Sequence, residues 1–155
     1  MPTITIYLTV FALSMVPVIE LRGAIPVGVL NGMNYWVSYA IAVLGSTVVV
    51  PVIIKFVRPV LGYLKNTRYG KRFASWIDQK AQKKKIKVES HKFLKVGLFI
   101  FVAIPLPGTG AWTGSLIAAV LNMRIRDALP PIFFGNVVAG AIMVVLSYYL
   151  HVIVL

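Results

Sequence analysis

Long stretches of the sequence carry no charged side chain. Residues 1–19, 23–54, 96–123 and 128–155 contain no Asp, Glu, Lys or Arg, and His151 is their one histidine. A helix on the surface of a soluble protein has a polar stripe along one side, which uncharged runs of this length do not provide. They need an apolar environment on every side, as in a lipid bilayer. The pattern therefore predicts an all-α integral membrane protein.

Two segments are long enough to cross the membrane as one helix, which takes about 20 residues. They are residues 34–57 and 131–154. Both are flanked by aromatic or basic residues of the kind that lie at membrane–water interfaces. The flanking residues are Tyr35, Trp36, Tyr39, Lys55 and Arg58 for the first segment and Tyr148, Tyr149 and His151 for the second.

Two further apolar segments are broken by proline and glycine. Residues 3–31 are interrupted by Pro17 and by the run Glu20-Leu21-Arg22-Gly23-Ala24-Ile25-Pro26, and residues 93–122 by Pro105-Leu106-Pro107-Gly108-Thr109-Gly110. Proline removes a backbone N–H and glycine favours turns, so neither run predicts a continuous helix. We expect each segment to form a re-entrant helical hairpin, which enters and leaves the bilayer on one side.

Matches between the two halves predict an internal repeat. Each half has a broken segment followed by a crossing segment, and small residues recur in the same order. The matches are Gly23-Ala24 with Gly110-Ala111, Gly28 with Gly114, Val29-Leu30-Asn31 with Val120-Leu121-Asn122, and Gly45-Ser46 with Gly135-Asn136. We therefore expect a single membrane domain over residues 1–155, with repeat one at 3–57, a connector at 58–95 and repeat two at 93–155.

Basic residues are concentrated in the connector. The chain has 16 Lys and Arg against 4 Asp and Glu, and thirteen of the sixteen lie between Lys55 and Lys95, with Asp78 and Glu89 as the acids there. Loops rich in Lys and Arg stay on the cytoplasmic side, so we expect residues 58–95 to be cytoplasmic in a multi-pass protein of the inner (plasma) membrane. Because each repeat would cross once, the second would be inverted, and the broken tips would meet near the midplane.

The connector itself is predicted to be an amphipathic helix on the membrane surface. Residues 64–95 place Phe73, Trp76 and Val88 near one face and lysines on the others. The run Lys83-Lys84-Lys85-Ile86-Lys87 would suit a nucleic acid in isolation. Between two membrane segments, anionic lipid headgroups are the expected partner, and no nucleic acid is expected.

Glu20 and Arg22 are the first candidates for a functional site. Ionisable groups at membrane depth are costly and mark a function by default, although a structural ion pair is the alternative. Two positions apart on a helix their side chains would diverge, so we expect non-helical backbone or other partners. A carboxyl group withdrawn from water binds a proton more readily, which would suit Glu20 to proton coupling. Arg22 stays charged and would suit a phosphate.

The second broken segment offers uncharged donors. Its glycines let backbone N–H groups approach an anion, Thr109 and Thr113 add hydroxyl groups, and a half-helix opening at Ala111 would present its N-terminus. The alternative is that the prolines and glycines only form the turn, and Trp112 would either shield the site or fill it. The candidate substrate-binding or coupling residues are Glu20, Arg22, Gly23, Pro26, Pro107, Gly108, Thr109, Gly110, Trp112 and Thr113.

These two segments resemble motifs of a known family. Residues 20–26 and 105–114 are similar to those of the small multidrug export proteins, which in turn resemble the DedA (VTT) membrane proteins. The DedA resemblance implies paired re-entrant hairpins and, for some members, transport of a polyprenyl phosphate carrier lipid; other members of the wider superfamily are lipid scramblases. The chain departs from the DedA pattern at Gly110, where an arginine usually stands.

The reactive side chains rank three classes of function. With no cysteine, two distant histidines and four acids, the chain holds no triad, paired-carboxylate or metal constellation, so we expect no enzyme, metal or cofactor. A scaffold would not need a charged, broken segment in the bilayer. We predict a transporter or flippase of an anionic carrier lipid such as polyprenyl phosphate, with proton coupling left open, acting as a homodimer. Export of small amphipathic or cationic compounds is the alternative.

Overall fold

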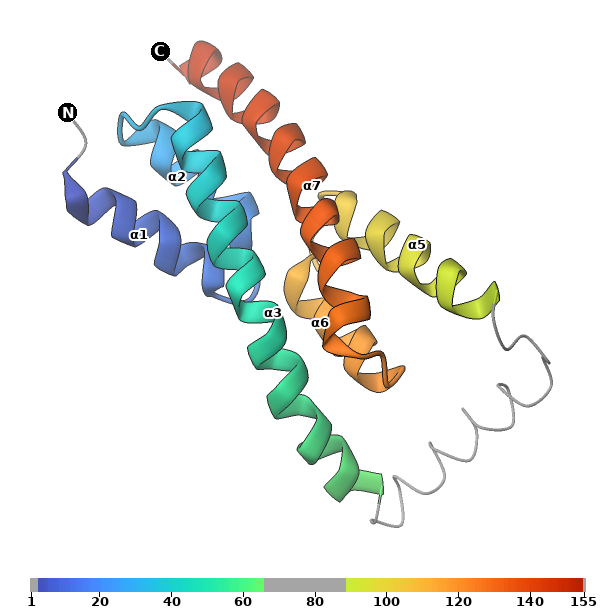
Figure 1. Cartoon of the computed structure of the whole chain (residues 1–155). Helices are drawn as coiled ribbons and strands as arrows, with labels where there is room; N and C mark the ends of the chain where they lie inside the picture. Colours follow the sequence, from blue (N-terminus) through green and yellow to red (C-terminus); the bar gives the residue numbers. More distant parts are fainter. Residues whose placement is uncertain (1–2, 66–88, 155) are drawn as a thin grey trace.

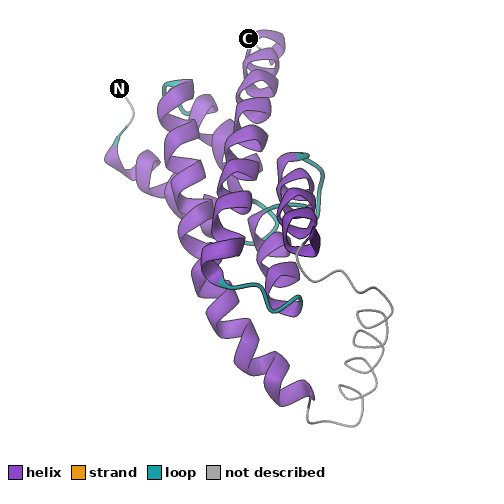
Figure 2. Cartoon of the chain, turned by 45° about the vertical axis from the view of Figure 1, so that its right-hand side comes forward, coloured by secondary structure: helices purple, strands orange, loops and turns teal. Residues whose placement is uncertain are grey.

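The structure, a computed structural model, describes residues 3–65 and 89–154. Within these ranges the chain forms helices joined by loops, without any strand (Figure 2). The helices are α1 (Ile4–Met15), α2 (Glu20–Leu30), α3 (Tyr35–Lys65), α5 (Glu89–Ala103), α6 (Ala111–Val120) and α7 (Ile125–Val154). The all-α prediction is confirmed for the described residues.

The two long helices, α3 and α7, pack against each other and run in opposite directions (Figure 1). Tyr35–Tyr63 has a mean hydropathy of 2.3 and Ile125–Tyr149 of 2.1, so both are long and apolar enough to cross a membrane. Large apolar side chains on them face outward, such as Phe56, which is 72% exposed, and Val145, which is 56% exposed. Contiguous exposed apolar surface of this kind is unfavourable in water and suits a lipid environment.

Both long helices exceed their predicted bounds because their prolines do not end them. α7 begins at Ile125 rather than at residue 131 and contains Pro130 and Pro131. α3 continues through Pro51 and Pro59 to Lys65, so it includes residues predicted for the connector. Proline removes one helical hydrogen bond, which membrane helices tolerate where neighbouring elements hold the backbone. Ala128 and Ile132, on either side of the α7 prolines, are fully buried.

The first interruption lies earlier than predicted. α1 ends at Met15 and α2 begins at Glu20, so residues 20–26 are helical and Pro26 lies inside α2. Val16 is extended, with φ −76° and ψ 132°, because the ring of Pro17 disfavours the helical conformation in the residue before it. The non-helical segment is therefore 16–19, directly ahead of the charged pair.

The second interruption lies where it was predicted. α5 ends at Ala103 and α6 begins at Ala111. Gly108 and Gly110 between them have φ of 87° and 141°, values that residues with a side chain rarely adopt.

Buried apolar side chains form two cores along the long helices. The core beside the first pair of short helices contains Val10, Leu21, Ala24, Ile25, Ala42 and Ala139. The core beside the second pair contains Val50, Ile54, Val102, Ala118, Ala128 and Ile132. Each core joins two short helices to both α3 and α7, which fixes the two interruptions relative to each other.

The predicted surface helix cannot be compared with the structure over most of its length. Residues 66–88, which include the run Lys83-Lys84-Lys85-Ile86-Lys87, lie outside the described residues. The ends of the predicted segment belong to α3 and to α5.

Candidate functional site

Glu20 and Arg22 form an ion pair at the start of α2. Nη1 of Arg22 lies 3.4 Å from Oε2 of Glu20, and the two side chains are 14% and 5% exposed. On a regular helix, side chains two positions apart point in different directions. The φ of Glu20 is +45°, so its backbone departs from the helical conformation, and the two side chains converge.

The Glu20 carboxylate also binds the N-terminus of α6. Its Oε1 accepts a hydrogen bond of 2.9 Å from the backbone N–H of Trp112. The first N–H groups of a helix have no partner within the helix, and no side chain of α6 caps them. The negative charge of Glu20 therefore lies at the positive end of the α6 dipole, where it is stabilising.

Gly110 leaves the room that this carboxylate occupies. A Cβ atom at position 110 would collide with Oε2 of Glu20 and with Nη1 of Arg22. Any side chain at this position would therefore displace the Glu20 carboxylate.

Arg22 connects α2 to the loop that precedes α6. Its Nη2 donates to the Thr109 hydroxyl oxygen at 2.8 Å and to the Ile104 carbonyl oxygen at 3.2 Å. The Thr109 hydroxyl in turn lies 2.6 Å from the same carbonyl oxygen. Nε of Arg22 is buried and has no hydrogen-bond partner among the described residues. The Nε–H of this guanidinium is therefore a donor without an acceptor in the described part of the chain.

Trp112 ties the two interruptions together a second time. Its indole Nε1 donates a hydrogen bond of 2.9 Å to the Met15 carbonyl oxygen, at the end of α1. The last carbonyl groups of a helix lack partners within it, so this bond satisfies one of them. The sequence had left open whether Trp112 shields or fills the site, and the structure gives it a hydrogen-bonding role.

The structure gathers half of the candidate residues and leaves the others around them. Glu20, Arg22, Thr109, Gly110 and Trp112 lie in contact. Gly23 packs closely against Ile19, where a Cβ would meet the Ile19 side chain at 2.6 Å. The remaining candidates make no polar contact with the charged pair in the described structure: Pro26 and Thr113 are half-buried, and Pro107 and Gly108 are exposed in the loop.

Two kinds of group were missed by the sequence analysis. The Met15 and Ile104 carbonyl groups contact the site through the backbone, which no side-chain pattern reveals. Asn136 is fully buried in α7, with its Nδ2 3.5 Å from Oγ1 of Thr47 and its Oδ1 without a partner in the described structure. In the sequence, Asn136 stands out as the one amide side chain in the uncharged run 128–155.

The arrangement could hold an anion in place of the Glu20 carboxylate. The charges of Glu20 and Arg22 offset each other, and the groups around them include the Trp112 N–H donor and the Ile104 carbonyl acceptor. In the described ranges, no three His, Asp or Glu side chains lie close enough together to hold a metal ion. A group that replaced the Glu20 carboxylate would meet the N–H of Trp112 and the guanidinium of Arg22.

The comparisons with known proteins identify the family of the chain. A family model described as "Putative small multi-drug export protein" matches residues 20–142, from the charged pair into the second half of α7. No curated protein and no solved structure matches the chain. Since the matched residues make up most of the chain and include the charged pair and the second interruption, the chain belongs to the small multi-drug export protein family.

Proposed function

We propose that this protein moves an anionic carrier lipid, of the polyprenyl phosphate type, across the plasma membrane, and that Arg22 binds the phosphate. The observation that carries this proposal is the Arg22 guanidinium, which is mostly buried and whose Nε has no hydrogen-bond partner among the described residues. A buried arginine normally uses its planar set of donors on carboxylate or phosphate oxygens.

A phosphate fits the available donors better than the carboxylate now present. Glu20 offers two oxygens, which take the Trp112 N–H and one distant Arg22 N–H. The 3.4 Å separation of the ion pair is longer than the 2.7–2.9 Å typical of charge-assisted hydrogen bonds. A terminal phosphate has three free oxygens and could accept from the Trp112 N–H and from two N–H groups of Arg22. The Thr109 hydroxyl would become a further donor if it turned away from the Ile104 carbonyl.

Coupling to protons follows from the same geometry. Glu20 occupies the place of the anion, so a charged Glu20 and a bound phosphate compete for the same donors. Protonation of Glu20 removes its negative charge and frees Arg22 and the α6 N-terminus. Arg22 is the one charged group that contacts Glu20 from any described element packed against it. Uptake of a proton would therefore favour uptake of the anion.

We further propose that the chain is an inverted repeat of two re-entrant hairpins, each followed by a crossing helix. Matching backbone hydrogen bonds support it, since Met33 N–H donates to the Gly28 carbonyl and Met123 N–H to the Ala118 carbonyl. These positions differ by 90 in both cases (123 − 33 and 118 − 28). On this register Gly32 corresponds to Asn122, and both residues have a positive φ. This register keeps the sequence match of Gly45 with Gly135, but it differs from the matches of Asn31 with Asn122 and of Gly28 with Gly114.

A similar helix contact recurs in the two halves, with the glycines 90 positions apart and their partners 88 positions apart. A Cβ at Gly45 would lie 2.9 Å from the Phe11 carbonyl oxygen, and one at Gly135 would lie 3.1 Å from the Phe99 carbonyl oxygen. In each half a short helix therefore packs against a glycine of the crossing helix. Two similar halves in opposite orientations would let the protein adopt two related conformations, one open to each side of the membrane. Exchange between such conformations is the basis of alternating access.

Charge distribution supports the proposed orientation. Besides Glu20 and Arg22, the charged side chains described lie at the end where α3 finishes and where α5 and α7 begin: Lys55, Arg58, Lys92, Lys95, Arg124, Arg126 and Asp127. The opposite end, at residues 31–34 and at Tyr148, carries no charge. We assign the basic end to the cytoplasm. A homodimer that encloses a transport path, and a role without enzymatic chemistry, complete this proposal.

Export of small amphipathic or cationic compounds is the second candidate, and the description of the family favours it. Glu20 would then be the ligand for the cation. Against this, both Glu20 oxygens already accept hydrogen bonds, and Arg22 would repel a cation at this distance.

The decisive experiment compares the two cargoes with purified protein in liposomes. Movement of a fluorescent polyprenyl phosphate between leaflets and uptake of a lipophilic cation are measured in parallel, with and without a pH gradient. Proton-dependent movement of the phosphate lipid without cation uptake supports the proposal. Cation uptake alone supports export, and failure of both leaves a non-transporting scaffold.

A further inference from the structure

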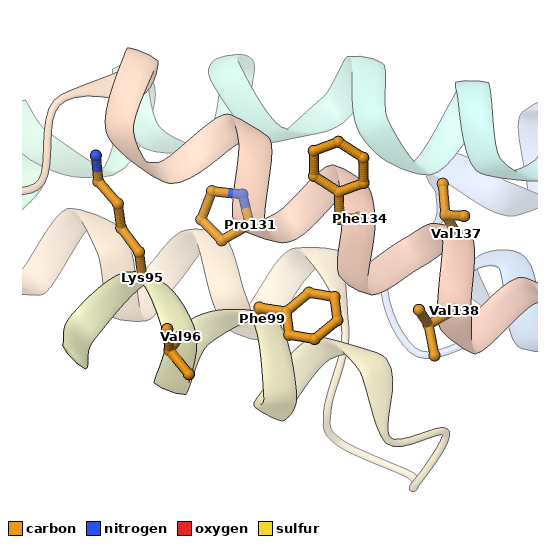
Figure 3. Close-up of a pocket in the computed structure, with 7 residues that line it drawn as sticks. All are labelled: Lys95, Val96, Phe99, Pro131, Phe134, Val137 and Val138. Atoms are coloured by element: carbon orange, nitrogen blue, oxygen red, sulfur yellow. The ribbon is translucent and has the colours of Figure 1, made fainter. Parts of the chain in front are cut away.

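An open groove of about 440 Å³ runs between α5 and α7, on the outer surface of the helix bundle (Figure 3). Its walls are apolar, with Val96 and Phe99 on α5 and Pro131, Phe134 and Val138 on α7. Phe134 and Val96 are 57% and 55% exposed. In a membrane this surface faces lipid chains.

One end of the groove is basic. Lys95 lies there, and its Nζ is 2.7 Å from Oδ1 of Asp127, with 42% of the Lys95 side chain exposed. Arg124 and Arg126, in the turn and first residues of α7, are also exposed. Together with Lys95, these arginines, which lie within three residues of Asp127 in the sequence, give this end three basic residues and one acid. The end therefore has an excess of positive charge.

The other end of the groove approaches the level of the charged pair. Val138 is followed by Ala139, which packs with Leu21 of α2 in the same core. On α5, Phe99 precedes the Ile104 carbonyl group that binds Arg22. The groove thus runs from the basic end of the bundle toward its middle.

We infer that this groove binds one hydrocarbon chain of an anionic lipid of the inner leaflet, with the phosphate of the lipid at Lys95. The direction of the groove matches such a lipid, whose headgroup lies at the membrane surface and whose chain points toward the midplane. The apolar lining suits the chain, and the excess of positive charge suits the phosphate. The site is separate from Arg22, and it needs only the proposed orientation, whether or not the protein transports lipid.

The occupant is tested by native mass spectrometry of the purified, delipidated full chain titrated with phosphatidylglycerol, with phosphatidylcholine of the same chains as the uncharged comparison. We expect tighter binding of the first phosphatidylglycerol molecule. Lys95→Ala should weaken that binding about fivefold and remove the preference for phosphatidylglycerol, because one cation near the lipid phosphate is lost. Asp127→Asn breaks the same ion pair but frees Lys95, so it should preserve or strengthen binding. Equal weakening by both variants would overturn the inference, because loss of the ion pair alone would then explain the weaker lipid binding.

A second comparison tests the groove itself. Val138→Trp fills the groove and should weaken phosphatidylglycerol binding, whereas Val48→Trp, at an exposed position of α3 outside the groove, should not. Val96→Trp fills the groove from α5 and replaces Val138→Trp if that variant does not fold. Unchanged lipid binding with filled grooves refutes the inference. If the filled groove alters the oligomeric state and leaves lipid binding intact, a second copy of the chain occupies it instead.

Discussion

The carboxylate of Glu20, in the first residue of α2, accepts a hydrogen bond of 2.9 Å from the backbone N–H of Trp112, in the second residue of α6. An acid from one half of the chain thereby caps a helix of the other half. This contact places the charged residues that follow the first interruption beside the glycine and threonine of the second.

Replacement of Glu20 by Gln keeps the shape of the side chain and removes its charge. We expect Glu20→Gln to fold and to lose the pH dependence of transport between about pH 5 and about pH 9, because the competition between carboxylate and substrate is gone. Rates of lipid movement in liposomes across this range measure it. Normal pH dependence in the variant would show that Glu20 has only a structural role.

Changes at Arg22 distinguish the two cargoes. Lys keeps the charge but not the planar pair of donors, so Arg22→Lys should weaken binding of a phosphate lipid and Arg22→Ala should abolish it, a loss of about 10-fold or more for each charged hydrogen bond. Binding is followed by titration of a fluorescent polyprenyl phosphate. If Arg22→Ala leaves lipid binding unchanged and increases cation uptake, the export candidate is correct, since the like charge that opposed the cation has been removed.

Replacement of Gly110 by Ala tests the contact between the interruptions. The added Cβ collides with the Glu20 carboxylate, so Gly110→Ala should lower the free energy of unfolding in detergent by about 1–3 kcal/mol. Gly108→Ala is the matched control, since Gly108 also has a positive φ but a Cβ added there would meet no atom within 4 Å.

The same variant can be examined in a double-mutant cycle. Glu20→Ala removes the group that is hit, so the effect of Gly110→Ala should be smaller in that background. Additive effects would mean that strain of the backbone, rather than the collision, determines the loss.

The indole hydrogen bond of Trp112 is expected to stabilise the fold. Trp112→Phe keeps an aromatic side chain but removes the N–H that binds the Met15 carbonyl and part of the ring volume. Loss of the hydrogen bond alone should cost about 1 kcal/mol, and more if the carbonyl is left without water. Denaturant unfolding measures this change. Trp36→Phe, at a side chain that is 68% exposed, should have little effect and serves as the control.

Orientation in the membrane is tested by labelling single cysteines, because the chain has none of its own. We expect Lys84→Cys to react with an impermeant maleimide from the cytoplasmic side, and Asn34→Cys and Leu155→Cys from the outside. Labelling of positions 34 and 84 from the same side would contradict the proposed inverted repeat.

The sequence by itself determined the class of protein and predicted the candidate site in its two broken segments. Uncharged apolar runs long enough to cross a bilayer specify helices in lipid. Their side chains need an apolar environment, and in that environment a helix satisfies the backbone hydrogen bonds within the segment. The family motifs lie at residues 20–26 and 105–114, and both segments contribute to the site. The interruption at 105–110 could also be predicted, because its prolines and glycines are visible in the sequence and favour a turn.

Tertiary structure decided which residues meet and in what geometry. Pro26, Pro130 and Pro131 read as helix breakers, yet packing on the two cores holds their backbone in helices. The positive φ of Glu20, which lets it pair with Arg22, follows from the turn at residues 16–19 and is not encoded by the identity of the residue. The bonds from Trp112 and Arg22 reach backbone groups 97 and 82 residues away. A sequence pattern describes neighbours along one chain segment, and these contacts exist because the cores bring two distant interruptions together.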